Sequence, residues 1–354
     1  MKRPTPAKRW PLPAGLLAGV AADALLGDPR RGHPVAAFGR AAGALQTRLY
    51  ADSTLSGAGY TAACVALAAA PALTAARLTR HRPWAALAAV TAATWAVTGA
   101  KSLTGEARKI GRALQAGDLD AARATLPSLC GRDPHGLDDL QISRAVVESV
   151  AENCGDAIVS PLVWGAAGGV PGLLAYRAIN TLDAMVGYRS PKLARFGTAS
   201  ARLDDVANWL PARLTAVLAA ACAPIVGGSS AAAWRIARRY GSRHPSPNAG
   251  HCEAAFAGAL GLRLGGANSY DGVAESRPEL GEGRAPEAAD IERAARLCRA
   301  VTVASAGAAA LAAVALAALP DARRRRSGAP AAPGRRSAPG KRTARGGRGG
   351  RGGA

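Results

Sequence analysis

Three acidic side chains follow one another at intervals of four residues near the middle of the chain. Glu148, Glu152 and Asp156 lie within about 80° of one face if this segment is helical. Carboxylates held this close repel one another, so a positively charged group is expected beside them. Mg²⁺ prefers carboxylate, water and phosphate oxygens as ligands. The spacing therefore predicts a magnesium site, and the alternative is a solvated acidic face paired with arginines.

A second set of acidic and amide side chains follows in the second half of the chain. Asp204 and Asn208 are one helical turn apart, and Asp205 adjoins them. Asp183 and Asn180 stand among apolar neighbours. A carboxylate here could bind a metal, hold a cationic substrate or accept a proton. The alternatives are helix capping and hydrogen bonds between packed helices.

Polar loops supply further candidates. Arg132 stands beside Asp133 and suits an anionic group, although a plain turn is the alternative. The segment 246–250 (SPNAG) is typical of a turn before a helix at 253–264, and 265–268 (GGAN) predicts a loop. Glycines let backbone amides approach a phosphate, but neither of these two segments contains GxGxxG or GxxxxGK[ST]. The evidence for a nucleotide motif is therefore weak.

Uncharged runs predict the elements that position these residues. Five runs of about 18 to 21 residues have the length that a helix needs to cross a bilayer, and a sixth, 12–26, resembles an uncleaved, partly inserted first helix. The alternative, buried helices of a large soluble protein, rests on their high alanine content. Small residues also allow close packing of membrane helices. We predict an all-α, polytopic integral membrane helical bundle with helical polar loops. The five runs are 57–76, 83–100, 157–176, 214–234 and 300–319.

The membrane topology requires one run to be unusual. The positive-inside rule places the basic tail and the short loop with Arg77, Arg80 and Arg82 in the cytoplasm. Simple alternation of crossings then places both long polar segments, 101–156 and 235–299, outside the cell, where an enzyme could not use a cytosolic nucleotide. The run 157–176 contains two prolines and four glycines. It is therefore the first candidate for a re-entrant segment.

The charge of the chain is concentrated at one end. The 354 residues are 49% hydrophobic and carry a net charge of +21, of which the segment 321–354 contributes +10. This segment lacks large apolar residues, so we predict a membrane domain at 1–320 and a disordered basic tail at 321–354. An extension that faces the cytoplasm or anionic lipid is favoured over RNA binding, and no nucleic acid is expected as a partner. The six cysteines lie too far apart to predict a zinc site or a disulfide framework, so we interpret them as small core residues.

Several segments of the chain, taken together, are specific to one protein family, although no single segment is. In their combination and order they resemble the CobD/CbiB family of cobalamin biosynthesis membrane proteins, the adenosylcobinamide-phosphate synthases, over about residues 12–319. The matching segments are DALLGDPRRGHPV (23–35), GRD (131–133), SRAVVESVAENCGDAIVSPL (143–162), YRAINTLDAMVGY (176–188), SARLDDVANWLPARL (200–214), SPNAG (246–250) and GALGLRLGGANSYDG (258–272).

The resemblance implies an amide ligation. A propionate side chain of adenosylcobyric acid is joined to (R)-1-amino-2-propanol or its O-phosphate, in a multi-pass protein of the cell membrane. A carboxylate is a poor electrophile, so we predict ATP-dependent formation of an acyl phosphate. The expected cofactors are ATP and Mg²⁺, and the expected partners are the bilayer, the two substrates and other corrinoid-pathway membrane enzymes.

Charge and spacing assign roles to individual residues. Asp183, Asp204 or Asp205 would accept the proton of the amine or bind it as a counter-ion, and Arg132 would bind phosphate. The predicted metal ligands are Glu148, Glu152 and Asp156, and the first two are also counted as catalytic. The predicted substrate-binding residues are Arg132, Asn153, Asn180, Asn208, Ser246, Asn248 and Asn268.

Two functions of other classes stay open. Acids at membrane depth and broken helices also suit an ion-coupled transporter, although no inverted repeat is visible in the sequence. A non-catalytic scaffold that gathers corrinoid enzymes at the membrane is the other alternative. It would need the apolar helices but not the acids.

Overall fold

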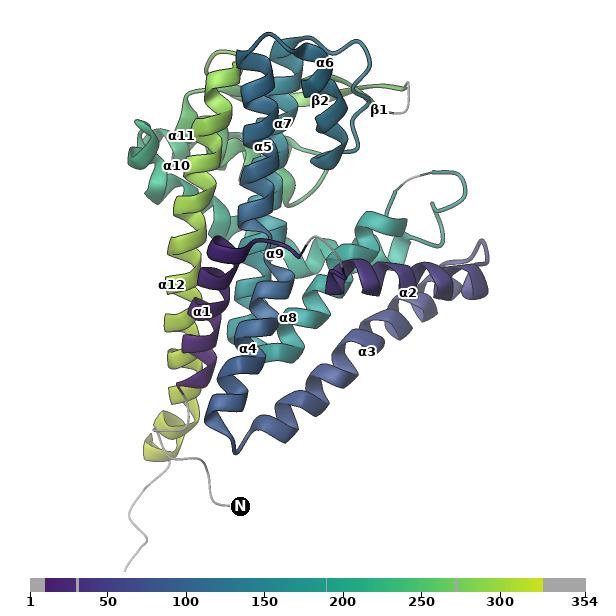
Figure 1. The fold of residues 1–354 in the computed structure, drawn as a ribbon, viewed down its shortest axis with the longest axis vertical. Coiled ribbons are helices and arrows are strands. Elements are labelled where there is room, and N and C mark those ends of the chain that lie inside the picture. Colours follow the sequence, from purple (N-terminus) through teal and green to yellow (C-terminus); the bar gives the residue numbers. More distant parts are fainter. Residues whose placement is uncertain (1–9, 30–31, 189, 271–272, 327–354) are drawn as a thin grey trace, which may run out of the picture. The chain divides into compact units, whose positions relative to one another are not determined.

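The computed structural model describes residues 10–29, 32–188, 190–270 and 273–326, and within them the side chains of 267–276 and 320–326 are left undescribed. The chain divides into two compact units, Met1–Ala317 and Ala318–Ala354. Helices dominate the first unit (Figure 1). The predicted all-α membrane bundle is therefore confirmed. The predicted domain boundary at 320 lies within a helix that continues to Arg326, and the rest of the predicted tail lies outside the described residues.

The long elements follow one another along the chain with short connections. The first helices are α1 (Pro11–Leu26), α2 (Pro34–Leu49), α3 (Thr54–Thr79), α4 (Pro83–Val97), α5 (Ala100–Gln115), α6 (Leu119–Thr125) and α7 (Asp139–Cys154). They are followed by α8 (Ser160–Val186), α9 (Thr198–Cys222), α10 (Ser230–Tyr240), α11 (Ala249–Leu260), strands β1 (Arg263–Tyr270) and β2 (Val273–Gly281), and α12 (Ala288–Arg326). Single turns of other helix types are η2 (Leu126–Ser128), η3 (Gly155–Val159), η4 (Ala223–Val226) and η5 (Gly241–Arg243).

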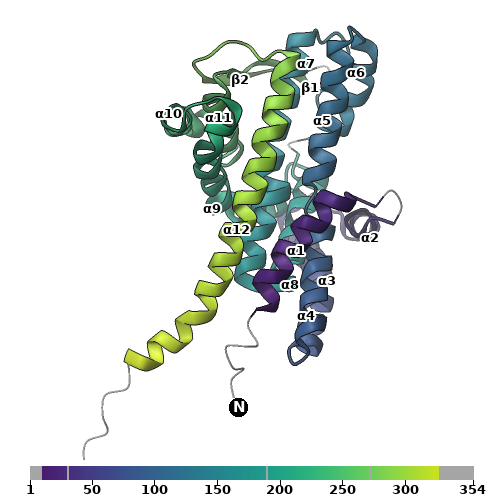
Figure 2. The same ribbon diagram turned by 60° about the vertical axis from the view of Figure 1, so that its left-hand side comes forward.

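The helices form two regions of different polarity. Figures 1 and 2 place α1, α3, α4 and α8 at one end of the first unit, and α5, α6, α7 and the β-hairpin at the other. Four helical segments of the described chain are long and apolar enough to cross a membrane. They are Thr54–Thr79, Asp139–Val186, Thr198–Val226 and Ala288–Leu319.

The apolar helices carry large hydrophobic side chains on their outer faces. On α3, Leu55 and Leu78 are 81% and 74% exposed, and on α12 Leu311 is 73% exposed. A single exposed leucine is ordinary in a soluble protein, but rows of them on long apolar helices indicate lipid contact. The surface therefore agrees with the membrane environment that the composition predicts.

The run 214–234 is not one membrane helix, and this prediction is wrong. Helix α9 ends at Cys222, and Gly227 adopts a left-handed conformation with φ 74° before α10 begins at Ser230. A side chain at Gly228 would collide with the carbonyl of Ala259 on α11. The break therefore lets the chain turn and lay α10 against α11. The apolar crossing candidate begins earlier, at Thr198.

The chain reverses direction within α8. The Tyr176 hydroxyl donates a hydrogen bond of 2.8 Å to the backbone carbonyl of Asp156, although 20 residues of straight helix would span about 30 Å. The reversal occurs at Gly169 (φ 60°, ψ −146°), and Gly172 packs against the backbone of Trp164. We call the two antiparallel arms, 160–168 and 170–186, the α8 hairpin. The reversal falls within the run 157–176, whose re-entrant passage through a bilayer stays a prediction.

Gly169 gives a first prediction. Its backbone conformation is one that only glycine adopts readily, so Gly169→Ala is expected to destabilise the protein by about 1–3 kcal/mol. The neighbouring variant Gly168→Ala is the control, because no atom lies within 4 Å of a side chain added there. Thermal unfolding in detergent measures both. Equal unfolding temperatures for the two variants would contradict the reversal.

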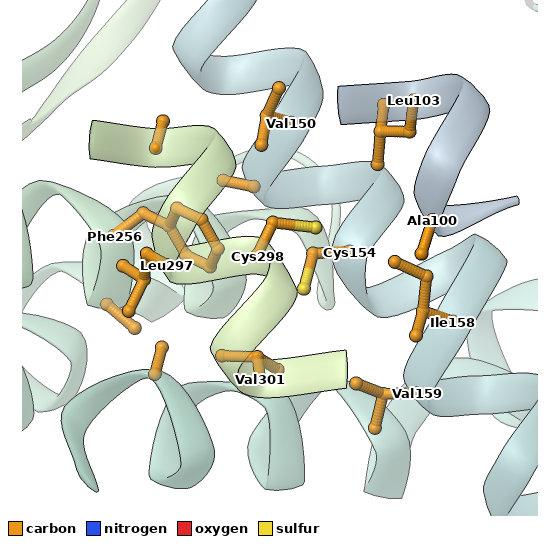
Figure 3. Close-up of a cluster of buried hydrophobic side chains, with 14 of the residues drawn as sticks. Ala100, Leu103, Val150, Cys154, Ile158, Val159, Phe256, Leu297, Cys298 and Val301 are labelled. Carbon is orange, nitrogen blue, oxygen red and sulfur yellow. The ribbon is translucent and has the colours of Figure 1, made fainter. Parts of the chain in front are cut away.

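The buried core joins the α7 region to the last helix. Figure 3 shows Cys154 of α7 beside Cys298 of α12, with Val150 and Phe256 packed around them. A side chain at Gly155 would come within 2.9 Å of the sulfur of Cys252, so glycine lets α11 approach this turn closely. All six cysteines are free thiols, and five of them are buried. The interpretation of the cysteines as small core residues is therefore confirmed.

The acid in the first apolar helix has a structural role. Asp23 is 1% exposed, and its Oδ2 accepts a hydrogen bond of 3.2 Å from the backbone amide of Lys101. That amide lies in the first turn of α5, whose own N-cap residue, Gly99, offers no side chain. Asp23, on α1, therefore caps the start of α5 and holds α1 at the junction of α4 and α5.

The segment after α11 is a β-hairpin, which the sequence analysis missed. The helix predicted for 253–264 ends at Leu260, because Gly261 takes a left-handed conformation with φ 71°. The predicted loop 265–268 belongs to β1, which pairs with β2 in antiparallel register. An irregularity between Leu264 and Gly266 shifts that register, and both glycines there have positive φ. This bulge brings the backbone of Gly265 to the site described below.

Candidate functional site

Helix α7 and the turn that follows it present the three predicted acids. Asp138 and Gln141 form a capping box that fixes the start of α7. Glu148 and Glu152 lie on α7, and Asp156 lies in the wide π-helical turn η3 that leads into the α8 hairpin. Such turns contain one extra residue and are frequent at functional sites. The three acids are thus on one continuous helical rod, but Asp156 lies beyond a local change of pitch.

Glu148 joins three segments that are far apart in the sequence. Its Oε2 accepts a hydrogen bond of 2.6 Å from Arg132, and its Oε1 accepts one of 2.7 Å from the backbone amide of Gly265. Arg144 lies 4.0 Å away, and Arg132 and Glu148 are 4% and 8% exposed. The Ser149 hydroxyl donates to the carbonyl of Leu129 and holds the loop that carries Arg132. Glu148 therefore anchors a buried arginine and the β-hairpin.

Asp204 and Asn208 lock α9 to both arms of the α8 hairpin. The Asn208 amide donates to Asp204 over 2.9 Å, and its carbonyl oxygen accepts from Ser160 at 2.6 Å and lies 2.8 Å from the Tyr176 hydroxyl, whose single proton is shared with the carbonyl of Asp156. Asn180 also lies 3.5 Å from Asp204. Asn208 is 1% exposed, so these bonds are shielded from water. The network places the carboxylate of Asp204 at the open end of the hairpin.

Negative charge accumulates at that open end. Asp156 is close enough to Asp204, Glu152 and Asp183 for their charges to repel. Glu152 and Asp156 are half-buried, and among the described residues neither carboxylate makes a hydrogen bond or an ion pair. Arg177, whose guanidinium donates to Asn180 at 3.3 Å, is a cation that partly offsets the charge of Asp156. We call Glu152, Asp156, Asp183 and Asp204 the acidic cluster, and its unbalanced charge suits a bound cation.

The acidic cluster can bind Mg²⁺ through two carboxylates in place of the three that the sequence predicts. Within the described part of the chain, no three His, Cys, Asp or Glu residues converge closely enough to hold a metal by themselves. Mg²⁺ usually takes one or two carboxylates and completes its shell with water and phosphate. Glu152 and Asp156 meet that requirement. Glu148 does not, because both of its oxygens are already engaged.

Guanidinium groups border the acidic cluster on the side of the β-hairpin. Arg132 and Arg144 approach Glu148, and a side chain added at Gly266 would lie 3.0 Å from Arg144 Nη1. The positive charge of Arg277, on β2, attracts the carboxylate of Glu152. Arginine forks bind phosphate and carboxylate in two parallel hydrogen bonds. The site therefore offers cationic and anionic groups side by side.

Sequence reasoning missed Glu253, a buried acid on α11. Its side chain is 3% exposed, and its Oε1 lies 3.8 Å from Nε2 of His244. Burial raises the pKa of Glu253 well above its usual range, and the charges of Glu148 and Glu152 raise that pKa further, whereas Arg277 and Arg132 lower it. No motif marks this residue in the sequence. Only the packing of α11 against α7 brings it to the site.

Several predicted site residues have structural partners instead. Asn248 donates to the carbonyl of Asp205 at 2.8 Å and accepts from Arg213, so it ties the start of α11 to α9. The Ser246 hydroxyl accepts from the amides of Asn248 and Ala249. Asn153 donates to the carbonyl of Ser149 within α7.

The last two predicted residues lie at the margin. Asp205 lies 3.6 Å from Arg202 and borders a surface pocket of about 390 Å³ that also touches Trp209. Asn268 belongs to β1, and its side chain lies outside the described residues. The structure thus gathers a subset of the predicted residues around α7, the α8 hairpin and α9. That subset is Arg132, Glu148, Glu152, Asp156, Asn180, Asp183, Asp204 and Asn208.

Comparison with known proteins identifies the fold that carries this site. The family model described as CobD/Cbib protein matches residues 16–298, which include every residue of the site. The chain belongs to the CobD/CbiB family. A CobD/CbiB relative named cobalamin biosynthesis protein CobD, from Mycobacterium tuberculosis, is 53% identical over 300 residues, covering 84% of this chain and 94% of the relative.

More distant CobD/CbiB relatives bear the same name. The protein from Geobacter metallireducens is 42% identical over 274 residues, covering 76% of this chain and 86% of the relative. That from Chromobacterium violaceum is 40% identical over 291 residues, covering 81% and 90%. No solved structure matches this chain. The family resemblance stated from the sequence motifs is confirmed.

Proposed function

We propose that this CobD/CbiB protein acts in cobalamin biosynthesis as an acid–amine ligase of the cell membrane. It would join (R)-1-amino-2-propanol, or its O-phosphate, to a propionate side chain of adenosylcobyric acid. The observation that carries the proposal is that a buried guanidinium group lies on the same helix face as carboxylates that form no ion pair among the described residues. The names of the relatives support the pathway.

The proposed reaction has two steps. The propionate attacks the terminal phosphorus of ATP, which gives an acyl phosphate and ADP. The amine then attacks the acyl carbon, a C–N bond forms, and phosphate leaves. Arg132 and Arg144 would hold the transferring phosphoryl group, since positioning and charge stabilisation supply most of the catalysis in phosphoryl transfer.

The acidic cluster would serve the cations of the reaction. Glu152 and Asp156 would hold Mg²⁺, which neutralises charge on the phosphates when it is bound. Asp183 and Asp204 would bind the ammonium group of the donor, because their charges add to the negative charge of the acidic cluster and Asp204 is held in place by Asn180 and Asn208. Glu148 would position Arg132 and would not bind the metal itself.

The direct test uses the full chain purified in detergent. Adenosylcobyric acid, ATP, Mg²⁺ and either donor are supplied, and the product mass and ADP are measured. The expected result is a product whose mass shows loss of one water from acid and amine, with ADP formed in equal amount. ADP formation that does not depend on adenosylcobyric acid, or no product with either donor, would overturn the proposal.

A transporter is the second candidate, because carriers also use broken helices at the bilayer midplane. The α8 hairpin is the observation that favours it. Uptake of a corrinoid into vesicles without any change of mass would support the carrier. The buried pair of Arg132 and Glu148, which joins α7 to the β-hairpin, favours the ligase, because a guanidinium group held beside carboxylates suits the binding of phosphate.

A further inference from the structure

The segment 243–253 builds a buried acid–imidazole pair that the proposed reaction has not yet used. Gly250 lets this segment fold tightly, because a side chain there would collide with the carbonyl of Gly241 and with the side chain of His244. The fold brings His244 to Glu253, and their side chains are 6% and 3% exposed. The pair is therefore almost completely withdrawn from water.

The backbone fixes which nitrogen of His244 carries the proton. The amide of Ser246 donates a hydrogen bond of 3.0 Å to Nδ1 of His244. Nδ1 is therefore an acceptor, and a neutral imidazole must carry its proton on Nε2. Nε2 is the atom that lies 3.8 Å from Oε1 of Glu253. Ser246 thus orients the imidazole so that its N–H faces the carboxyl group.

The charged groups around Glu253 belong to the site. Glu148 and Glu152 act on it from α7, Arg277 acts from β2, and Arg132 acts from its loop. Among the described residues, Glu253 makes no hydrogen bond to any of these four groups. Cys252, its neighbour on α11, packs against Gly155 at the start of η3. Glu253 is therefore held beside α7 but keeps its carboxylate available for a proton.

We propose that Glu253, oriented by His244, accepts the proton that the ammonium group of the amine donor must lose before it attacks. This inference rests on the proposed ligation. The ammonium gives one proton to Glu253 and becomes a free amine, and the amine attacks the acyl carbon. The C–N bond forms, the bond from carbon to the phosphate oxygen breaks, and the second proton of the nitrogen leaves with the phosphate. When the products leave and water enters the site, Glu253 gives its proton to that water.

The test compares two nucleophiles on the full chain in detergent. Aminopropanol is an ammonium ion at neutral pH, whereas hydroxylamine is uncharged and captures an acyl phosphate as a hydroxamate. Glu253→Gln is expected to form hydroxamate and ADP at the native rate but to lose amide formation by about 100-fold, the size of a general-base contribution. His244→Gln is expected to lose amide formation in the same selective way, to a smaller extent. Glu279→Gln is the control, because that carboxylate is 58% exposed on β2.

The pH profile supplies a second readout. In the native protein, amide formation should fall as the pH drops through the raised pKa of Glu253, since protonation removes the acceptor. In Glu253→Gln the fall that is due to Glu253 should disappear, and the rate should instead follow the fraction of free amine, so that it rises only at the higher pH where the amine itself loses its proton. Such rescue at high pH is not expected from a residue that only holds the fold together.

Each outcome has a separate meaning. Equal losses of hydroxamate and amide in Glu253→Gln, or no loss of either, would overturn the role of Glu253. If Glu253→Gln does not fold but His244→Gln does, His244→Gln is measured instead. Selective loss of amide formation in that variant would support the pair, and unchanged amide formation would overturn it. Absence of ATP-dependent hydroxamate from the native protein would instead overturn the proposed ligation, and a normal Glu279→Gln rules out a general effect of removing charge.

Discussion

Arg132→Met is expected to lower the free energy of unfolding by about 3–5 kcal/mol and to abolish ligation. The substitution removes the guanidinium that lies 2.6 Å from Glu148, in a pair that is 4% and 8% exposed. The carboxylate would stay buried beside the amide of Gly265 without its nearest cation. Chemical unfolding in detergent and the product mass measure the two effects.

A double variant separates stability from activity. Arg132→Met combined with Glu148→Met replaces the buried ion pair by apolar side chains of similar length, a change that is often neutral for stability. We expect most of the lost stability to return while ligation stays absent, because the phosphate-binding arginine is still missing. Recovery of activity in the double variant would show that the pair serves only the fold. Native stability of the single variant would contradict the burial of the pair.

Glu152→Gln is expected to reduce ligation by about 100-fold or more, comparable with the removal of one preorganised charge from an active site. Glu152 is half-buried, and among the described residues it makes no ion pair, so the substitution leaves no other side chain without a partner. The protein should therefore insert and fold normally. Initial rates measured over a range of Mg²⁺ concentrations give both the maximum rate and the concentration needed for half of it.

The metal assignment depends on the shape of that titration. We expect Glu152→Gln to need more Mg²⁺ and to stay slow when Mg²⁺ is saturating. Asp120→Asn is the control, since this side chain is 95% exposed on α6, which contributes no residue to the site. Normal turnover of Glu152→Gln at saturating Mg²⁺ would remove Glu152 from the metal site.

The local parts of the site could be predicted from the sequence. The spacing of Glu148, Glu152 and Asp156 is a property of one helix, and helical periodicity is visible in any single sequence. The glycines and prolines of 157–176 likewise indicate a break where Gly169 reverses the chain. Such features depend on residues close together in the chain, so the sequence carries the information directly.

The long-range parts could not be predicted in the same way. The amide of Gly265 meets Glu148 across 117 residues, and nothing in either segment indicates the other. Glu253 lies in a sequence without any motif and reaches the site only through the packing of α11. The run 214–234 shows the converse error, because average hydrophobicity does not register the left-handed turn at Gly227. The family resemblance suggested the class of reaction, whereas only the tertiary contacts show which side chains lie together in the site.

The reversal at Gly169 bears on how the substrates reach the site. If the α8 hairpin enters a bilayer, it makes no net crossing, so α7 before the hairpin and the start of α9 after it would open to the same aqueous compartment. Glu152 and Asp204 would then draw on a single pool of solutes. The nucleotide, magnesium and amine of the proposed reaction would all have to arrive from that pool, and a donor delivered only to the opposite face would have to be carried across before it could react.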